Sequence, residues 1–247
     1  TYASGVPSPA SSGASPGPDL VAFADPVYNR ADARISPFRP ASNSFPVQEL
    51  PRLTGTARET AAVFDTWPGP KRLFTGPQAN RQTLLDTIRQ SPGILHLATH
   101  VIAAPQDPSD ARIALSMAPD RETVEQVTSQ ELLHLRHHTG LVVMTGCASG
   151  RGQAVPGAGL VGLSRAWLVS GAQGVLASLW PMPDDSGELA TAFYRHLKRL
   201  ERGPPHRRWA RALQSAQREM RQSSGWRSQA PYWASYFLLM RSERSGL

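Results

Sequence analysis

Two residues capable of joint nucleophilic and acid–base chemistry occur in this 247-residue chain. His100 ends the segment ILHLATH, and Cys147, the only cysteine, ends LVVMTGC, 47 residues later. The thiolate is the attacking species, and an ordinary thiol with a pKa near 8.5 is mostly protonated at neutral pH. An imidazole beside the thiol can take that proton, so the pair predicts covalent catalysis through a thioester.

The two residues follow apolar runs that read as buried strands. ILHLA (94–98) and LVVM (141–144) are short, continuous and apolar, as is typical of strands covered on both faces. If the two strands are neighbours in a parallel sheet, both exits lie at the same edge, where reactive groups of such sheets gather. Small residues around Cys147 would leave its sulfur accessible, and loop amides there could stabilise an oxyanion.

The rest of the chain alternates strands with amphipathic helices. This alternation predicts an α/β fold with a mainly parallel central sheet and helices on both faces. The predicted strands are 20–23, 71–74, 94–98, 112–116 (a weaker edge strand), 141–144, 174–180 and 232–240. The predicted helices begin near residues 56, 80, 128, 159 and 185, and a further helix is indicated by the stripe Trp209, Leu213, Ala216 and Met220.

Several helix starts carry capping signals. A Thr or Asp followed three residues later by Glu has the spacing of a capping box, in which both side chains satisfy amides of the first turn. This spacing occurs at Thr56/Glu59, Thr128/Glu131 and Asp185/Glu188, and Asn80 is a further predicted cap.

Five segments in order resemble one known family. They are GILHLATH, LVVMTGCASGRG, GLVGLSRAWLVSGAQGVLASLWPMPDD, AFYRHL and PYWASYFLL. Together, from about Leu20 to Met240, they are similar to a CHAT domain, the caspase-like peptidase module related to separase and the caspases. In caspases the histidine precedes the cysteine by about 50 residues, as here. The resemblance implies a caspase-like fold and a cysteine endopeptidase that needs no cofactor.

Carried onto this sequence, the resemblance implies a catalytic dyad. His100 would be the base and Cys147 the nucleophile, with the backbone amides of Cys147 and Val101 forming the oxyanion hole. The family usually has Gly after its histidine, where this chain has Val101, and Gly146 and Ala148 also depart from the pattern around the cysteine. A β-branched residue does not readily adopt a glycine-only conformation, so Val101 bears on catalytic efficiency.

Three acidic residues are candidates for substrate binding. Similarity to separases nominates Asp184 and Asp185, and similarity to metacaspase-type enzymes nominates Asp25 after the first strand. A carboxylate in a small pocket would favour a basic P1 side chain. Ordinary roles remain open: Asp184 and Asp185 could be helix N-caps, and Asp25, before Pro26, a turn residue.

The chain is predicted to hold one domain. Residues 1–19 are rich in Ser, Pro and Gly and predict a disordered linker, whereas residues 20–247 form the CHAT-type domain. The chain does not begin with Met, so we expect a piece of a longer protein. The family commonly lies behind tetratricopeptide repeats or sensor regions, which implies a regulated effector of bacterial type and a regulatory region or partner protein of that kind.

Composition bears on the cellular compartment of the protein and on the kinds of ligand that it can bind. A single cysteine without a C-x-x-C pair predicts a reducing, cytoplasmic setting, and no thiolate metal site. No apolar stretch reaches the roughly 18 residues of a membrane span. His134, His137 and His138 have helical spacing but no acidic partner nearby, so we predict no metal site there. His96 lies deeper in its strand than His100 and reads as an interior histidine.

Two other functions compete with the peptidase. One is a catalytically idle CHAT domain that serves as a protein-interaction module, in which Val101 reflects lost selection for hydrolysis. The other is nucleic-acid binding, suggested by a net charge of +7 and a pI near 10.3. Because the arginines are scattered among acidic residues, nucleic acid is not favoured as a direct ligand. The expected partner is a protein or peptide substrate.

Overall fold

The computed structural model describes residues 19–30, 32–34, 50–104, 107–118, 123–145, 158–180, 182–185, 187–200 and 203–241. Cys147, the segment around it, and all of the predicted linker except Asp19 lie outside these ranges.

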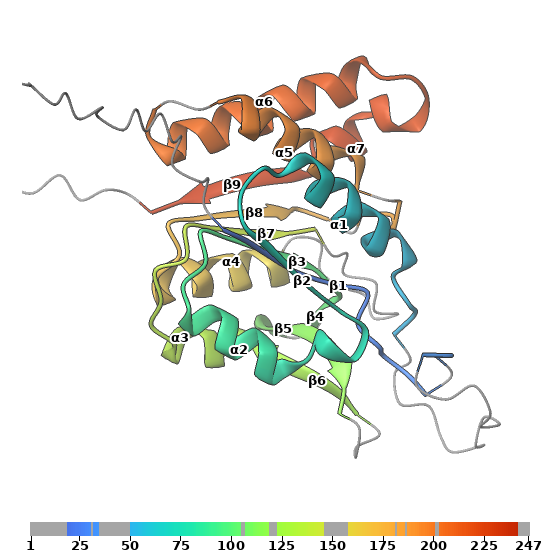
Figure 1. Cartoon of the computed structure of the whole chain (residues 1–247), viewed down its shortest axis with the longest axis vertical. Helices are drawn as coiled ribbons and strands as arrows, with labels where there is room; N and C mark the ends of the chain where they lie inside the picture. The colour runs from blue at the N-terminus through green and yellow to red at the C-terminus, as the bar shows by residue number, and fades with distance from the viewer. Residues whose placement is uncertain are drawn as a thin grey trace, which may run out of the picture.

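A six-stranded sheet forms the centre of the molecule (Figure 1). The strand order is β2-β1-β3-β7-β8-β9, in which the first five strands are parallel and β9 is antiparallel. The prediction of a mainly parallel sheet is therefore confirmed. The bounds are β1 Leu20–Ala24, β2 Lys71–Thr75, β3 Ile94–Ala98, β7 Leu141–Met144, β8 Gly174–Ser178 and β9 Tyr236–Met240.

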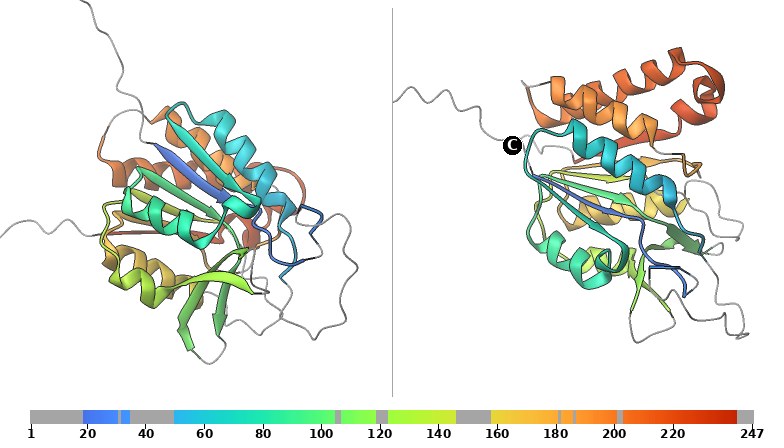
Figure 2. Two further views of the ribbon diagram at one scale, coloured as in Figure 1. Left: turned by 60° about the horizontal axis from the view of Figure 1, so that its bottom comes forward. Right: turned by 45° about the vertical axis from the view of Figure 1, so that its right-hand side comes forward.

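Helices cover both faces of this sheet (Figures 1 and 2). One face carries α1 (Thr54–Thr66), α5 (Glu188–Arg199), α6 (Pro205–Gln222) and α7 (Ala230–Trp233). The other carries α2 (Arg81–Arg89), α3 (Ser129–His134) and α4 (Ala158–Ser170). Single 3-10 turns lie at Gly76–Gln78 and Gly225–Ser228. The face of α5 that meets the sheet is apolar: Leu189, Phe193 and Leu197 are all buried in one core cluster.

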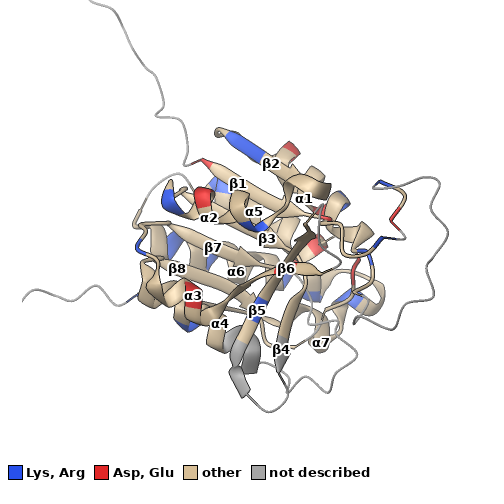
Figure 3. Ribbon diagram, turned by 90° about the horizontal axis from the view of Figure 1, so that it is seen from below, with Lys and Arg blue, Asp and Glu red and all other residues tan. Residues whose placement is uncertain are grey.

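A second sheet, which is antiparallel, follows β3 in the chain. It consists of β4 (Val101–Ala104), β5 (Asp107–Met117) and β6 (Val124–Thr128) in the order β4-β5-β6. The run at 112–116, predicted as an edge strand, is part of the middle strand β5. Apolar β5 side chains, including Ile113 and Leu115, join the same core cluster as α4, which explains why a central strand here is apolar. In the view of Figure 3, charged residues are dispersed over several elements on this side of the molecule.

Of the four predicted helix caps, two are confirmed and two are wrong. Asn80 accepts from the Thr83 amide at 2.9 Å, and Thr128 and Glu131 form a complete capping box. The Thr56 prediction is wrong, because α1 begins at Thr54, after Leu53. The Asp185 prediction is also wrong: α5 begins at Glu188, after a left-handed Gly187 (φ 66°). In both places the helix start is set by tertiary contacts described below.

The last predicted strand is only partly correct. The segment 232–240 was expected to be a single strand, but the short helix α7 takes its first residues and β9 begins at Tyr236. The turn between them is tied by Ser235, whose hydroxyl donates to the Tyr232 carbonyl over 2.7 Å. The exposed end of β9 leaves Leu239 and Met240 partly in solvent.

Candidate active site

Three strands end together at one edge of the sheet. Ala24 of β1 pairs with Ala98 of β3, and the amide of Thr145, directly after β7, donates to Leu97 of β3 over 3.2 Å. The residues that follow these strands therefore emerge beside one another, as the sequence predicted for parallel neighbours. Thr145 is the last described residue before Cys147, two positions further on.

His100 is completely buried at this edge and held from two sides. Its backbone amide donates to the Tyr28 hydroxyl over 3.1 Å, and the two rings pack with centroids 4.8 Å apart. Its ring Nε2 lies 2.8 Å from the carbonyl oxygen of Pro51. Because a carbonyl can only accept, Nε2 must carry a proton, and in the neutral ring Nδ1 is then the basic nitrogen. Burial raises the pKa of Tyr28, so its hydroxyl stays protonated.

Val101 lies in a regular β-strand. It begins β4 and pairs with Ile113 of β5, and it is not among the described residues with positive φ. Valine adopts extended backbone readily, so the structure places no glycine-only requirement on this position. The valine at position 101, where the family usually has Gly, therefore does not strain the backbone.

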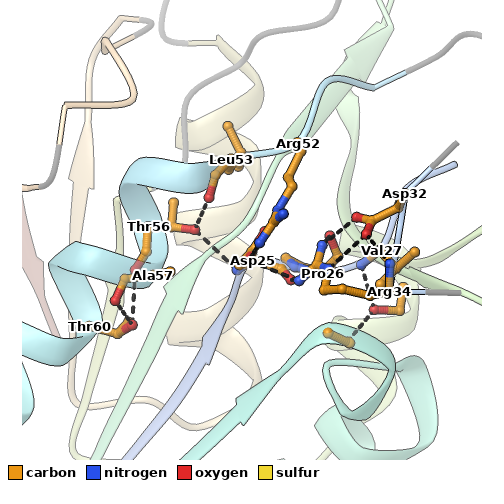
Figure 4. Close-up of polar contacts among 12 residues, drawn as sticks. Asp25, Pro26, Val27, Asp32, Arg34, Arg52, Leu53, Thr56, Ala57 and Thr60 are labelled. Atoms are coloured by element: carbon orange, nitrogen blue, oxygen red, sulfur yellow. Dashed lines mark hydrogen bonds and ion pairs between the residues drawn. The ribbon is translucent and has the colours of Figure 1, made fainter. Parts of the chain in front are cut away.

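Asp25 is a buried carboxylate that the chain itself neutralises (Figure 4). Arg52 binds it through two hydrogen bonds, Nε to Oδ1 at 2.9 Å and Nη2 to Oδ2 at 2.7 Å. Arg34 adds a third, Nη1 to Oδ2 at 2.8 Å, and the hydrogen bond to Asp25 raises the pKa of Arg52. The Asp25 amide donates to Thr56 Oγ1 over 3.0 Å, so the hydroxyl predicted to cap α1 serves β1 instead.

Asp184 and Asp185 lie between β8 and α5 and are tied into the fold. Asp184 Oδ2 accepts from the amide of Gly55, over 2.8 Å, and thereby caps α1 from a distant part of the chain. Asp185 accepts from the Gly187 amide at 3.1 Å and pairs with Arg227 at 3.0 Å. Each nominated carboxylate therefore already has a structural partner.

Asp184 and Asp185 nevertheless line a small pocket at the same sheet edge. The other lining residues are Leu53, Thr56, Glu59, Thr145 and Pro183. The pocket is partly open to solvent, and its interior has room for about one water molecule. Since Thr145 precedes Cys147 by two residues, this pocket adjoins the end of β7 from which the predicted nucleophile continues.

Beneath the pocket lies a polar cluster that the sequence analysis did not identify. His96 is completely buried; its Nδ1 lies 3.0 Å from the Tyr194 hydroxyl and its Nε2 3.3 Å from Thr145 Oγ1. Glu59 Oε1 lies 2.9 Å from the same Nε2. The interior role predicted for His96 is confirmed. Glu59 carried a misleading signal, because its spacing from Thr56 suggested a helix cap.

The remaining histidine candidates have ordinary contacts. His134 Nδ1 donates to the Gln130 carbonyl over 2.8 Å, and His137 is buried between the hydroxyls of Thr139 and Ser170 at 2.9 Å each. Over the described ranges, no group of three or more His, Cys, Asp or Glu side chains is arranged to hold a metal ion. Nor does any helix in those ranges have the length and apolarity to cross a membrane.

The chain is similar to several known proteins. A mouse protein, tetratricopeptide repeat protein 28, is 39% identical over 92 residues, which are 37% of this chain but 4% of that protein. The chain therefore spans a small fraction of this relative. The crystal structure of the Arg-specific cysteine proteinase gingipain R matches with a TM-score of 0.46 and 6% identity, over 90% of this chain and 46% of that one. The family description "CHAT domain" matches residues 3–242, nearly the whole sequence, and the protein therefore belongs to the CHAT domain family.

Proposed function

We propose that this CHAT domain is a cysteine endopeptidase in which Cys147 is the nucleophile and His100 the base. The observation that carries the proposal is the fixed His100 ring. Its Nε2–H is bound to the Pro51 carbonyl, which directs proton transfer to Nδ1. The ring stands at the end of β3, next to β7, whose continuation leads to Cys147 two residues after Thr145.

The proposed reaction follows from these groups. Nδ1 of His100 takes the thiol proton, and the thiolate of Cys147 attacks the scissile carbonyl carbon to form a tetrahedral oxyanion. Backbone amides of Val101 and Cys147 stabilise that oxyanion. The imidazolium then protonates the leaving amine, and the C–N bond breaks to leave a thioester. Water, deprotonated by His100, hydrolyses the thioester and restores the thiol.

A basic P1 side chain is the proposed substrate preference. The pocket beside β7 is lined by Asp184, Asp185 and Glu59. Arg227 already pairs with Asp185, so a cation entering the pocket would meet the carboxylates of Asp184 and Glu59. Asp25 is a weaker candidate, because Arg52 and Arg34 already neutralise it. The regulatory region is proposed to be of tetratricopeptide type, in keeping with the name of the mouse relative.

The reactivity of the single cysteine tests the dyad directly. At pH 7, iodoacetamide should label Cys147 at least about ten-fold faster than N-acetylcysteine, because a neighbouring imidazole raises the thiolate fraction. The variant His100→Gln should lose that acceleration. Labelling at the N-acetylcysteine rate in both proteins would contradict the dyad and favour the idle interaction module.

A further inference from the structure

Glu59 of α1 is a buried carboxylate whose hydrogen bonding is incomplete. Its side chain is 6% exposed, and Oε1 accepts no hydrogen bond from any residue that the structure describes. His96 Nε2 is 2.9 Å away, within ion-pair distance, but the ring N–H does not point at this oxygen well enough to form a hydrogen bond. A buried carboxylate is costly unless it is both paired and fully hydrogen-bonded, so Glu59 is poorly explained as a stabilising residue.

The surrounding backbone makes room for this side chain. Gly187, which precedes α5, has a φ of 66°, and a Cβ built there would lie 2.2 Å from Glu59 Cγ. Any other residue would therefore push Glu59 out of its place, in addition to straining the left-handed backbone. The α5 helix thus begins with a glycine at the point where the chain passes over the Glu59 carboxylate.

The His96 ring has three polar neighbours. Burial raises the pKa of Tyr194 well above its usual value, so its hydroxyl keeps its proton, and it lies 3.0 Å from Nδ1. Its Nε2 faces both Thr145 Oγ1 at 3.3 Å and Glu59 Oε1 at 2.9 Å. Nε2 is hydrogen-bonded to Thr145, and Glu59 Oε1 has no hydrogen-bond donor among the residues that the structure describes.

The pocket lies directly against this carboxylate. Glu59, Thr56 and Thr145 form part of its lining. The neighbouring Asp184 and Asp185 already accept from Gly55 and from Gly187 and Arg227. Glu59 therefore differs from both aspartates in having a buried oxygen that accepts no hydrogen bond over the described ranges. An ammonium group, close in size to one water molecule, or one N–H edge of a guanidinium would supply the missing donors in the space available.

We propose that Glu59 is the specificity-determining residue of this pocket, where it receives the cationic head of a substrate lysine or arginine side chain. His96 holds the carboxylate in place when the pocket is empty. The inference rests on the proposed peptidase for its substrate, but the binding of a cation does not require catalysis. Lysine carries an ammonium group and arginine a guanidinium group, and the test distinguishes between these two substrate side chains.

The test measures binding of small cations to the full chain carrying Cys147→Ala. Calorimetry would compare n-butylammonium, n-butylguanidinium and the neutral n-butanol. We expect a cation to bind at least about ten-fold more tightly than n-butanol, with Glu59→Gln removing that advantage. Asp65→Asn, which removes an exposed carboxylate from the same helix, is the matched control and should bind as the parent does. Tighter binding of the ammonium or of the guanidinium identifies lysine or arginine as the preferred side chain.

Two results would overturn the inference: neither cation binds better than n-butanol, or Glu59→Gln binds both cations as the parent does. If Glu59→Gln fails to fold, Glu59→Asp, which keeps the charge but shortens its reach, should show partial loss, and unchanged affinity there would also overturn it.

Failure of the inference is distinguishable from failure of the peptidase. Cleavage after Lys or Arg that persists in Glu59→Gln on the wild-type background would overturn the role of Glu59 and leave the peptidase intact. Glu59-dependent cation binding in a protein that cleaves no peptide would support the site and contradict the peptidase.

Discussion

The ring Nε2 of His100 donates its hydrogen bond to the carbonyl oxygen of Pro51 over 2.8 Å. Pro51 directly precedes Arg52, which binds Asp25. One short stretch before α1 therefore both fixes the tautomer of the proposed base and neutralises a carboxylate at the end of β1. This arrangement makes the stretch a structural support of the site.

The His100 tautomer is the first testable consequence. Above the pKa of the ring, ¹⁵N NMR of the isolated chain should show a protonated Nε2 and an unprotonated Nδ1 for His100, because the carbonyl of Pro51 can only accept. His134, whose Nδ1 donates to a helix carbonyl, should show the opposite tautomer and is an internal reference. A protonated Nδ1 in neutral His100 would contradict the proposed direction of proton transfer.

Asp25 should be important for stability. Asp25→Asn removes the charge that binds Arg52 and Arg34, and we expect the free energy of unfolding in urea to fall by about 1–3 kcal/mol. Arg52→Gln should cost less, about 0–1 kcal/mol, because the Arg52 side chain is about half exposed. If Asp25→Asn instead left stability unchanged and abolished cleavage at basic P1, Asp25 would be a substrate ligand.

Gly55 offers a test of the contact between α1 and the pocket wall. Replacing a helical glycine by alanine ordinarily stabilises a protein by up to about 1 kcal/mol. Here the new Cβ would lie 2.3 Å from Asp184 Oδ1 and 2.7 Å from its backbone. We therefore expect Gly55→Ala to lower the free energy of unfolding by about 1–3 kcal/mol, because overpacking outweighs helix propensity. A stabilised Gly55→Ala variant would show that Asp184 does not pack against α1.

His137 should make stability dependent on pH. Burial, with a smaller effect of the nearby His138, lowers the pKa of His137 to about 4. The unfolded chain, with an ordinary histidine pKa near 6.5, binds the proton more tightly. The contribution of the buried, neutral His137 to stability is therefore complete above about pH 6.5 and is lost as the pH falls from there towards 4.

The variant His137→Gln isolates this effect from other titrating groups. Urea unfolding at pH 7 and at pH 5 should show a smaller loss of stability between the two values in His137→Gln than in the wild type. An equal loss in both proteins would mean that His137 is not the residue responsible.

Much of the fold could be predicted from the sequence because its signals are local. Strands β3 and β7 are short apolar runs, and Asn80 and Thr128 cap helices through contacts within three residues. The predicted caps at Thr56 and Asp185 were wrong, because distant contacts set these helix starts: Asp184 accepts from the first turn of α1 from 129 positions away. Local spacing does not report such tertiary competition.

The candidate site was predicted in part. The strand ends that place His100 were visible as apolar runs followed by polar residues. The Glu59 carboxylate was not, since its burial depends on a glycine 128 positions later that has no side chain to collide with it. The contact between Arg52 and Asp25 could not be predicted either, because nothing near Asp25 in the sequence points to Arg52.

Peptide cleavage tests the central claim most directly. A library that scans every residue at P1 would be incubated with the wild type and with Cys147→Ala, each alone and together with the proposed tetratricopeptide-type regulatory region. We predict cleavage after Lys or Arg by the wild type and a loss of at least about a thousand-fold in Cys147→Ala. Equal cleavage by both proteins, or none by either with that regulatory region present, would contradict the account.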